Sequence, residues 1–565
     1  MRKLKDYKSL KDPVYGYIKI PMKYMSDIVD SAVFQRLRRI IQTSYSPLYS
    51  SAVHNRFVHS LGVYYLGTIA AKNVERELEN ITEMKKEDIH HLGEIFELAC
   101  LLHDVGHAPF SHTGEKLYLS DDLKYNQIHK LLVDEVDTKS FTKDIEHYAG
   151  KCAAPHEIMS AIVGIRAFPN HIVKAGDKEF FARCITGYKY TESGCENSIK
   201  NCFVSLLNSN VIDVDKLDYL IRDAYITGFN TVRIDYIRLL NALTVKECDE
   251  EYQIAYYKDA ISVIENVVYA HDAERKWIQN HPVVLYECYI LNHVFLHLNE
   301  KLNTKKSRLF SYESLSEEGN VLNKGIRVSL LCDDDIIYIM KNVKECKTEL
   351  STEYFNRNKR RHPVFKSEAE YGAFISNALG GGEYMKAFED AMKATAAYLM
   401  SMSDTWTIDD KTIEKLENEL KILKDIDNCK YDEDTIKAQK ENKEAALKLS
   451  KCLIEFADRN GLLHDFVIIE ASQFSSGFAK PDFSKIPIIF NSSSDEIIET
   501  DFEKVARPLK AGAVDREKFY YLFYRRGDDN SEIDKAELCS FLASQFSAVH
   551  TKKKRKKIKK EESNA

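Results

Sequence analysis

An apolar segment that ends in an adjacent histidine and aspartate constrains the fold of this chain more than any other feature. Apolar side chains recur at helical spacing over residues 95–102, and His103–Asp104 follows directly. The glycine and proline within Gly106–Pro109 then end the helix and turn the chain, so that His107 and His112 can face the same space. Clustered ionisable groups are costly to bury without a purpose. The segment therefore predicts a helix that ends at a polar site, and the alternative is a set of core histidines that only satisfy hydrogen bonds.

An adjacent pair cannot complete a metal coordination shell, and two distant segments offer the missing imidazole and carboxylate. His59 precedes apolar residues at helical spacing, and Asp215 lies in the segment DVDKLDYLIRD. Together with His103 and Asp104 they form a mixed nitrogen and oxygen set, which suits Mn²⁺ or Fe²⁺ best, allows Zn²⁺ and suits Mg²⁺ less. Such a metal polarises a phosphoryl oxygen and orients a hydroxide. The four residues therefore predict a hydrolytic site for a phosphate ester.

The segment around Asp215 predicts one wall of this site. On a helix, Asp215, Tyr219 and Asp223 share one stripe, and apolar residues occupy the opposite side. The alternative is a solvated face that carries an Asp218–Arg222 pair. The positive charges and proton donors that a phosphate ester needs are available from Arg56, Lys216, His107 and His112.

Length and composition predict a cytoplasmic protein of several structural units. The 565 residues exceed one ordinary core, and the net charge of −7 argues against a protein that coats nucleic acid. The 12 cysteines include no C-x-x-C pair, and the N-terminus has no apolar leader. No uncharged apolar stretch reaches the roughly 20 residues of a membrane span. We therefore expect reduced cysteines and no membrane contact.

The order of patterns along the chain predicts a mainly α fold. A charged, helix-prone arm at about 405–451 predicts an exposed helical hairpin. Short apolar runs predict strands at 466–469, 486–490 and 521–526, before a helix at 532–546. We expect a catalytic core with an N-terminal effector segment at 1–300, a helical extension at 301–460, a small α/β unit at 461–548 and a disordered basic tail at 549–565. The basic run at 552–560 is a solvated tail, a nucleic-acid contact or an import signal.

Five motifs resemble a known family in their order and spacing. They are DPVYG at Asp12–Gly16, FQRLR at Phe34–Arg38, HNRFVHSLGV at His54–Val63, HDVGHAPFSH at His103–His112 and DVDKLDYLIRD at Asp213–Asp223. The chain resembles the HD-domain phosphohydrolases, and within them the dNTP triphosphohydrolase branch, over about its first 240 residues. The resemblance implies a helical HD-domain core with helical extensions and a small C-terminal α/β unit. It also implies hydrolysis of a dNTP to a deoxynucleoside and triphosphate.

The resemblance implies a role for each site residue. The four residues named above would bind the metal, and His112 would be placed to protonate the leaving 5′ oxygen. His156 matches a further active-site histidine of the family, and Glu115 lies where an acidic partner occurs. The side chains that it places against the triphosphate are Arg56, His107, Lys216 and Tyr219. Those that it places against the sugar and the base are Gln42, Asp223 and Trp277.

One departure from the family pattern leaves the substrate open. After Gln42 the chain continues Thr43-Ser44-Tyr45, one residue shorter than the family's glycine-rich turn. A small, polar Thr43 leaves space for a 2′-hydroxyl, so a ribonucleoside triphosphate is an alternative substrate. A nuclease or phosphodiesterase is a further alternative, and a nucleotide-sensing scaffold with a structural metal is another.

The resemblance also implies regulation. Regulated members of the family are tetramers that nucleotides activate at a second site, and the matching positions here are Lys8, Asp30, Gln35, Arg38 and Arg238. We therefore expect a GTP or dNTP effector that organises a homo-oligomer, either a dimer or a tetramer. The alternative is that Gln35 and Arg38 only stabilise the N-terminal helix.

Overall fold

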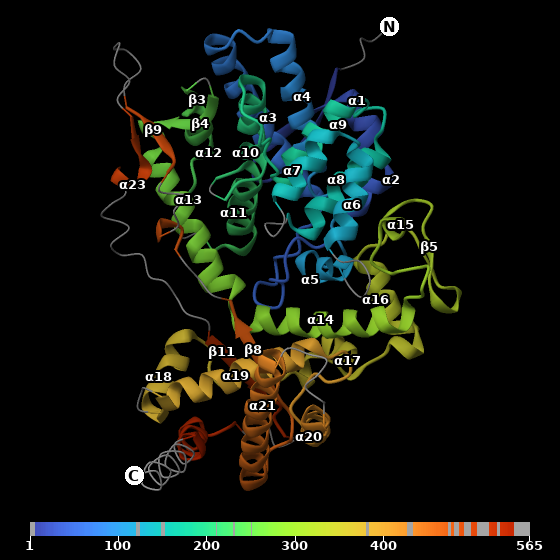
Figure 1. Ribbon diagram of the computed structural model, residues 1–565, viewed down its shortest axis with the longest axis vertical. Coiled ribbons are helices and arrows are strands. Elements are labelled where there is room, and N and C mark those ends of the chain that lie inside the picture. The colour runs from blue at the N-terminus through green and yellow to red at the C-terminus, as the bar shows by residue number, and fades with distance from the viewer. Residues whose placement is uncertain are drawn as a thin grey trace. The chain divides into compact units, whose positions relative to one another are not determined.

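The fold of this protein is mainly α, as its sequence predicts (Figure 1). The structure is a computed structural model, which describes residues 6–119, 125–148, 153–210, 212–229, 232–249, 251–379, 383–425, 433–472, 476–479, 485–490, 499–505, 519–527 and 532–546. The chain forms two compact units that alternate along the sequence. The first unit contains 1–278, 301–346 and 475–515, and the second contains 279–300, 347–474 and 516–565.

The first unit begins with a β-hairpin and continues with a series of helices. Strands β1 (Tyr7–Asp12) and β2 (Gly16–Pro21) pair in antiparallel register. The helices that follow are α1 (Met22–Tyr24), η1 (Met25–Val29), α2 (Ala32–Gln35), η2 (Arg36–Arg39), α3 (Arg56–Ile81), α4 (Lys86–Leu102), α5 (His112–Glu115), η3 (Lys116–Leu119), α6 (Tyr125–Val136), α7 (Lys139–His147), α8 (Pro155–Ala167), α9 (Ala175–Thr186), α10 (Cys195–Leu207) and α11 (Val214–Thr227).

The core of the first unit forms where α3 and α4 pack against each other and against α9, α10 and α11. Phe96 of α4 and Phe203 of α10 are fully buried, with ring centroids 5.4 Å apart. Gly67 lets α3 approach α4 closely, because a Cβ atom at this position would lie 2.6 Å from the Sγ atom of Cys100. This packing brings the first turn of α3, the end of α4 and the start of α11 together.

The rest of the first unit contains a four-stranded sheet with the strand order β10-β9-β4-β3. Its strands are β3 (Leu243–Cys248), β4 (Glu251–Tyr257), β9 (Pro487–Ile489) and β10 (Glu499–Asp501). The other elements of this part are α12 (Tyr236–Asn241), η4 (Lys258–Ala260), α13 (Ile261–Glu274), η5 (Arg275–Gln279), α15 (Tyr312–Leu315), β5 (Asn320–Val321), η6 (Asn323–Gly325), β6 (Arg327–Val328), α16 (Asp333–Asn342), η7 (Lys344–Cys346), η9 (Gly477–Ala479) and α23 (Phe502–Val505).

The second unit surrounds a three-stranded sheet with the order β7-β11-β8. Its elements are α14 (Pro282–Leu302), α17 (Glu349–Phe355), η8 (Arg357–Lys359), β7 (His362–Pro363), α18 (Glu368–Leu379), α19 (Glu383–Ser401), α20 (Asp410–Asp425), α21 (Glu433–Asn460), β8 (Phe466–Ala471), β11 (Phe519–Tyr524) and a helix at 535–546. Arg361 is buried beside the sheet, where it donates to Asp465 at 2.6 Å and to Glu353 at 2.8 Å. These bonds compensate its buried charge.

The three strands expected near the C-terminal end all form, but they belong to two sheets. Strands β8 and β11 pair with each other in antiparallel register, whereas β9 pairs in parallel with β4 of the first unit's sheet. A run as short as Pro487–Ile489 carries no signal for its partner, so sequence alone grouped the three strands together. The basic run at 552–560 lies outside the described residues.

The charged arm forms a helical hairpin of α20 and α21, and several of its apolar residues are buried, although Ile422 is exposed. Leu416 of α20 and Ala446 of α21 lie in one core cluster with Ala394 and Tyr398 of α19. The sparse apolar positions of the arm are therefore enough to dock it on α19.

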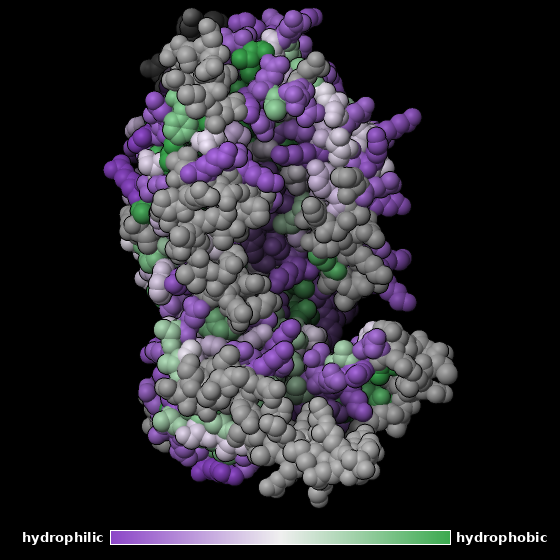
Figure 2. All heavy atoms as spheres, turned by 60° about the vertical axis from the view of Figure 1, so that its left-hand side comes forward, coloured by the Kyte–Doolittle hydropathy of each residue, from purple (hydrophilic) through white to green (hydrophobic). Residues whose placement is uncertain are grey.

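Hydrophilic residues dominate the described part of the face in Figure 2, and the hydrophobic areas on it are small and separate. Every helix among the described residues is too short or too polar to span a lipid bilayer.

Candidate metal site and its surroundings

Three helix ends position the four candidate metal ligands. The Asn55 side chain caps α3 by accepting from the Val58 N–H at 3.3 Å, which fixes His59 within the first turn. Helix α4 ends at Leu102, so His103–Asp104 follows at its C-terminus. Asp213 caps α11 by accepting from the Lys216 N–H at 2.7 Å, which places Asp215 in the first turn of that helix.

The candidate ligands converge as the sequence predicts. The Nε2 atom of His59 lies 2.9 Å from Asp215 Oδ1 and 3.3 Å from His103 Nε2. The Nε2 atom of His103 lies 3.5 Å from Asp104 Oδ1 and 3.6 Å from Asp215 Oδ1. His59, His103 and Asp104 are buried, and their ligand atoms lie within 4.8 Å of one another, as a group that could hold a metal ion requires. Two imidazole nitrogens and two carboxylates fit a divalent ion.

The second nitrogen of each histidine is held by a neighbour. His103 Nδ1 donates to the Cys100 carbonyl at 2.9 Å, and His59 Nδ1 donates to Asp218 Oδ2 at 2.7 Å. A carbonyl can only accept, so Nδ1 of His103 carries its proton, and the carboxylate favours the same tautomer for His59. The Nε2 atoms of both histidines therefore face the cluster, and a bound metal would replace the proton that Asp215 otherwise favours on Nε2 of His59.

The Asp218–Arg222 pair is buried, which excludes the alternative of a solvated pair. Asp218 is completely inaccessible, and Arg222 donates to it at 2.9 Å and to Asp12 at 3.0 Å. The DPVYG motif therefore contributes Asp12 to the support of His59. The i, i+4 spacing of the two residues signals a pair, but the sequence does not show that a histidine joins it.

The electrostatics of the cluster favour a bound cation. Burial disfavours a charged His59, but hydrogen bonds to Asp215 and Asp218 outweigh it and raise the pKa of His59 to about 10. Burial also disfavours a charged Asp104, but Arg56 and the nearby histidines hold the pKa of Asp104 well below its usual value. The carboxylates therefore stay ionised and attract positive charge.

A second group of side chains borders this cluster. The rings of His107 and His156 stack at 4.1 Å, and His112 lies edge-on to both. Glu115 accepts from His156 and lies 3.2 Å from His112 Nδ1. Burial opposes the charges of this pair, yet mutual attraction raises the pKa of His156 and lowers that of Glu115. Although the ligand atoms of these three histidines could also surround a metal, Arg56 is only 3.4 Å from His112 Nε2, and its charge favours an anion there.

Arg56 joins the two groups. Its guanidinium donates to Asp104 at 2.8 Å, to the Ser111 hydroxyl at 2.9 Å and to the Gln42 carbonyl at 3.3 Å. Arg36 supports the turn that carries His107, because it donates to the carbonyls of His107 at 3.0 Å and Val105 at 2.7 Å. Neither Ser111 nor Arg36 was predicted from the sequence to have a role at the site.

The predicted substrate residues have different surroundings. Gln42 Oε1 and Thr43 Oγ1 are buried and have no hydrogen-bond partner among the described residues. Asp223 is buried against His54, at 2.6 Å, and Lys216 donates to Asp213 and to the Ser209 carbonyl, both at 2.5 Å.

The two predicted aromatic contacts also differ. Tyr219 has a raised pKa, because it is buried and lies near Glu274 and Asp215. Trp277 is 54% exposed, with the Lys276 ammonium 4.9 Å from its ring centroid.

The predicted effector residues fall into two places. Gln35 donates to the Val29 carbonyl at 2.6 Å and accepts from Arg38 at 2.8 Å, while Lys8 and Asp30 are exposed. Arg238 lies on α12 and lines a cavity of about 710 Å³ together with Lys258. The bonds of Gln35 support the alternative that it stabilises the N-terminal helices.

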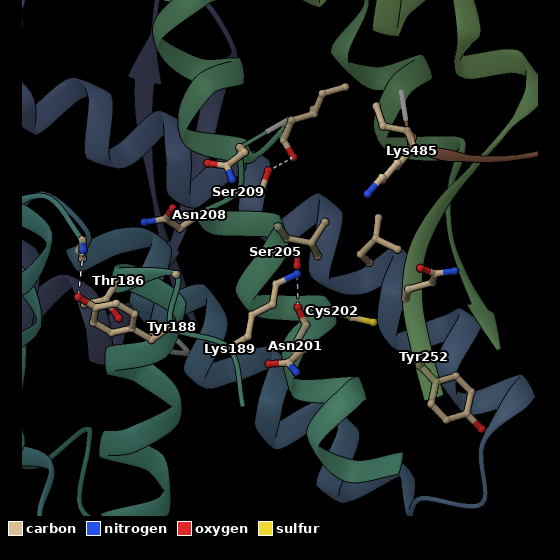
Figure 3. Close-up of a pocket in the computed structure, with 18 of the residues that line it drawn as sticks. Thr186, Tyr188, Lys189, Asn201, Cys202, Ser205, Asn208, Ser209, Tyr252 and Lys485 are labelled. Carbon is tan, nitrogen blue, oxygen red and sulfur yellow. Dashed lines mark hydrogen bonds between the residues drawn. The ribbon is translucent and has the colours of Figure 1, made fainter. Parts of the chain in front are cut away.

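A second cavity, of about 760 Å³, is lined largely by residues of α10 and β4 and of the loops around them (Figure 3). Lys189 and Lys485 enter it from different walls. Its inner wall includes Ser209, which holds Lys216, and Asn208, which donates to Glu157 at 2.9 Å. This cavity was not predictable from the sequence, because its lining comes from six separate parts of the chain.

Known proteins resemble this chain in sequence and in fold. The sequence model of the HD domain family matches residues 56–164, from the start of α3 into α8. The uncharacterized protein YwfO of Bacillus subtilis is 29% identical over 282 residues, which are 50% of this chain and 53% of that protein. The deoxynucleoside triphosphate triphosphohydrolase SAMHD1 of Bos taurus is 27% identical over 283 residues, which are 49% of this chain and 45% of that protein.

The chain spans about half the length of the curated relatives it matches. Its fold is similar to the crystal structure of a hypothetical protein from Aquifex aeolicus, with a TM-score of 0.50 and 18% identity, over 95% of this chain and 99% of that one. The match over residues 56–164 contains His59 and His103–Asp104, and the fold adds Asp215 to them. By this match, the chain contains an HD domain over residues 56–164.

Proposed function

We propose that the protein is a metal-dependent phosphohydrolase that converts a deoxynucleoside triphosphate and water into a deoxynucleoside and triphosphate. One observation carries the proposal: Arg56 bonds to Asp104 in the candidate metal cluster and also lies against His112 in the neighbouring histidine group. A cation site and an anion site that share one arginine suit a phosphate ester. The similarity to a bovine dNTP triphosphohydrolase supports this choice of substrate.

The candidate metal ligands are His59, His103, Asp104 and Asp215. A divalent ion held by these residues, Mn²⁺ or Fe²⁺ in preference to Zn²⁺ or Mg²⁺, would supply Lewis-acid charge to a phosphoryl oxygen. Asp218 and the Cys100 carbonyl keep both Nε2 atoms directed at this position.

The remaining residues bind the substrate and move the proton. Water attacks the α-phosphorus, and the bond between that phosphorus and the 5′ oxygen breaks. His112, oriented by Glu115, donates the proton to the leaving 5′ oxygen, and His156 keeps Glu115 ionised. The residues that hold the triphosphate are Arg56, His107, Lys216 and Tyr219. Those that hold the sugar and base are Gln42, Asp223 and Trp277.

The buried, unpartnered hydroxyl of Thr43 favours a second candidate, hydrolysis of a ribonucleoside triphosphate. A 2′-hydroxyl would give Thr43 Oγ1 the hydrogen-bond partner that a buried polar atom needs. The Gln42 amide beside it would take the 3′-hydroxyl in either case.

The effector residues support a proposal of regulation. Arg238 and Lys258 both line the 710 Å³ cavity, but Asp235 and Asp259 line it too, so the proposal of a GTP or dNTP effector rests on the resemblance of the five effector positions to the family. The effector would organise a homo-oligomer, either a dimer or a tetramer. Sedimentation of the protein with and without GTP should show a shift to larger species, and one unchanging species together with unactivated kinetics would contradict it.

Chromatography of the products tests the proposed reaction. Purified protein with Mn²⁺ should release a deoxynucleoside and intact triphosphate from dNTPs, supplied singly and mixed. Release from NTPs instead would favour the second candidate. If an Asp215→Ala variant still hydrolyses nucleotides, the assignment of Asp215 as a metal ligand is wrong. If the protein cleaves an oligonucleotide but hydrolyses none of the nucleotides, it is a nuclease instead.

A further inference from the structure

A carboxylate far outside the matched HD domain connects two loops of the site. Asp333 is the first residue of α16 and is buried. Its Oδ1 atom accepts from the Phe110 N–H at 2.7 Å, and its Oδ2 atom accepts from the Ile41 N–H at 2.9 Å. Both oxygens of one side chain therefore hold backbone groups of separate segments.

Each of these segments carries a proposed substrate residue. Ile41 immediately precedes Gln42, and Phe110 is two residues before His112. The segments also bond directly to each other, because the Ser111 hydroxyl donates to the Ile41 carbonyl at 2.5 Å. Asp333 thus connects the loop that carries Gln42, which is proposed to bind the sugar, to the loop that carries His112, which is proposed to transfer the proton.

The backbone at Phe110 needs such support. Phe110 has a φ of 56° and Ser111 a φ of 53°, which is the left-handed region that residues with a Cβ atom rarely adopt. Strained conformations persist only where the surrounding structure holds them, and they concentrate at functional sites. The bond from Phe110 N–H to Asp333 acts at the first of these two residues.

Helix capping does not account for Asp333. The capping role belongs to Asp335, which accepts from the Cys332 N–H at 2.8 Å. Asp334 is exposed, and its carboxylate lies 3.5 Å from Arg39. Three consecutive aspartates therefore serve three separate purposes, and only the first reaches the site loops.

We infer that Asp333 is a positioning residue, which sets the distance between Gln42 and His112 for the bound nucleotide. This inference rests on the proposed function, since it assigns substrate roles to both of those residues. An asparagine at position 333 keeps one accepting oxygen and replaces the other with an NH₂ group, so it retains at most one of the two bonds.

The test compares Asp333→Asn with the matched control Asp334→Asn, which removes a neighbouring charge from the surface. Steady-state kinetics with dNTPs should show that Asp333→Asn lowers kcat at least tenfold and raises KM, with Mn²⁺ content unchanged. Asp334→Asn should stay within twofold of the wild type. A variant that merely unfolded in part would lower the active fraction and leave KM unchanged, so equal KM values would overturn the inference, as would wild-type kcat.

Hydrogen exchange tests the bridge without a substrate. In Asp333→Asn at least one of the amides of Ile41 and Phe110 should exchange at least tenfold faster than in the wild type, because asparagine keeps only one accepting oxygen. In Asp334→Asn both amides should exchange at the wild-type rate. If the wild-type protein hydrolyses no nucleotide, the proposed function is wrong. The hydrogen-exchange rates still show whether Asp333 holds the two loops together. Unchanged exchange at both amides would overturn the inference whatever the activity.

Discussion

His59 donates its Nδ1 proton to Asp218 at 2.7 Å, and this bond determines which nitrogen of His59 faces the candidate metal cluster. Asp218 is itself fixed by Arg222, which also reaches Asp12. The metal cluster therefore depends on three residues that would not touch the metal. Outer residues of this kind commonly change metal affinity by about 10- to 100-fold when they are replaced.

We predict that Asp218→Asn weakens Mn²⁺ binding by about 10- to 100-fold, since the neutral amide holds the His59 tautomer less well. The substitution also leaves Asp12 as the one carboxylate that still accepts from the buried Arg222 among the bonds described above. Isothermal titration with Mn²⁺ measures the effect, and Asp88→Asn, an exposed position in the first turn of α4, is the control. Equal affinities of Asp218→Asn and wild type would remove Asp218 from the metal site.

Removal of the metal should abolish hydrolysis. Protein treated with a chelator is expected to lose turnover, and Mn²⁺ or Fe²⁺ should restore it, because the four candidate ligands hold the only Lewis acid in the proposed reaction. Asp215→Ala should show the same loss without recovery. If metal analysis shows that the protein contains no metal and it is still fully active, the proposed metal dependence is wrong.

We predict that His112→Ala lowers kcat by about 10²- to 10⁴-fold, the usual contribution of a general acid. Glu115→Gln should lower kcat less, because it disturbs only the orientation of His112 and His156. Both variants should bind Mn²⁺ as the wild type does. His90→Ala, at an exposed position on α4, is the control, and a His112→Ala variant with wild-type kcat would exclude His112 as the proton donor.

The Thr43 hydroxyl should influence the choice of sugar. Thr43→Val keeps the shape of the side chain and removes the hydroxyl, so it should lower the ratio of kcat/KM for GTP to that for dGTP by about tenfold, the effect of about one lost hydrogen bond. A ratio equal to that of the wild type would show that Thr43 does not contact the 2′ position.

The pH dependence of the free energy of unfolding should reveal the titration of Asp333. Burial raises its pKa to about 7, against the hydrogen bonds from Ile41 and Phe110, with Asp334 adding to the rise and Arg36 opposing it. An unfolded aspartate titrates near about 4, so the folded protein binds more protons between roughly pH 4 and 7. The contribution of Asp333 to the free energy of unfolding therefore falls as the pH rises through this window.

Urea denaturation across that window measures this contribution. The free energy of unfolding of Asp333→Asn should fall less steeply with pH than that of the wild type, because the titrating group is gone. Parallel pH profiles for the two proteins would contradict the raised pKa of Asp333.

The sequence predicted the helical fold and the convergence of the four candidate metal ligands because their signals are local. His103 and Asp104 are adjacent at a helix end, and His59 and Asp215 each stand in a recognisable motif near a helix start. Their convergence at 2.9 to 3.6 Å needed only the packing of α3, α4 and α11.

Residues that act through long-range bonds were not predictable. Asp333 lies 223 positions from Phe110 and binds backbone N–H groups, which leave no pattern in side chains. The sequence left open a surface pair of Asp218 and Arg222, because helical spacing does not reveal which face is buried. Strand β9 pairs with a strand more than 200 positions earlier, so its place in the first unit depends on tertiary contacts alone.

The fate of the water oxygen tests the central claim most directly. Hydrolysis of a dNTP in ¹⁸O-labelled water, followed by mass spectrometry of the products, identifies the bond that breaks. The account predicts one labelled oxygen in intact triphosphate and an unlabelled deoxynucleoside. Label in the deoxynucleoside, or release of phosphate or diphosphate in place of triphosphate, would contradict it.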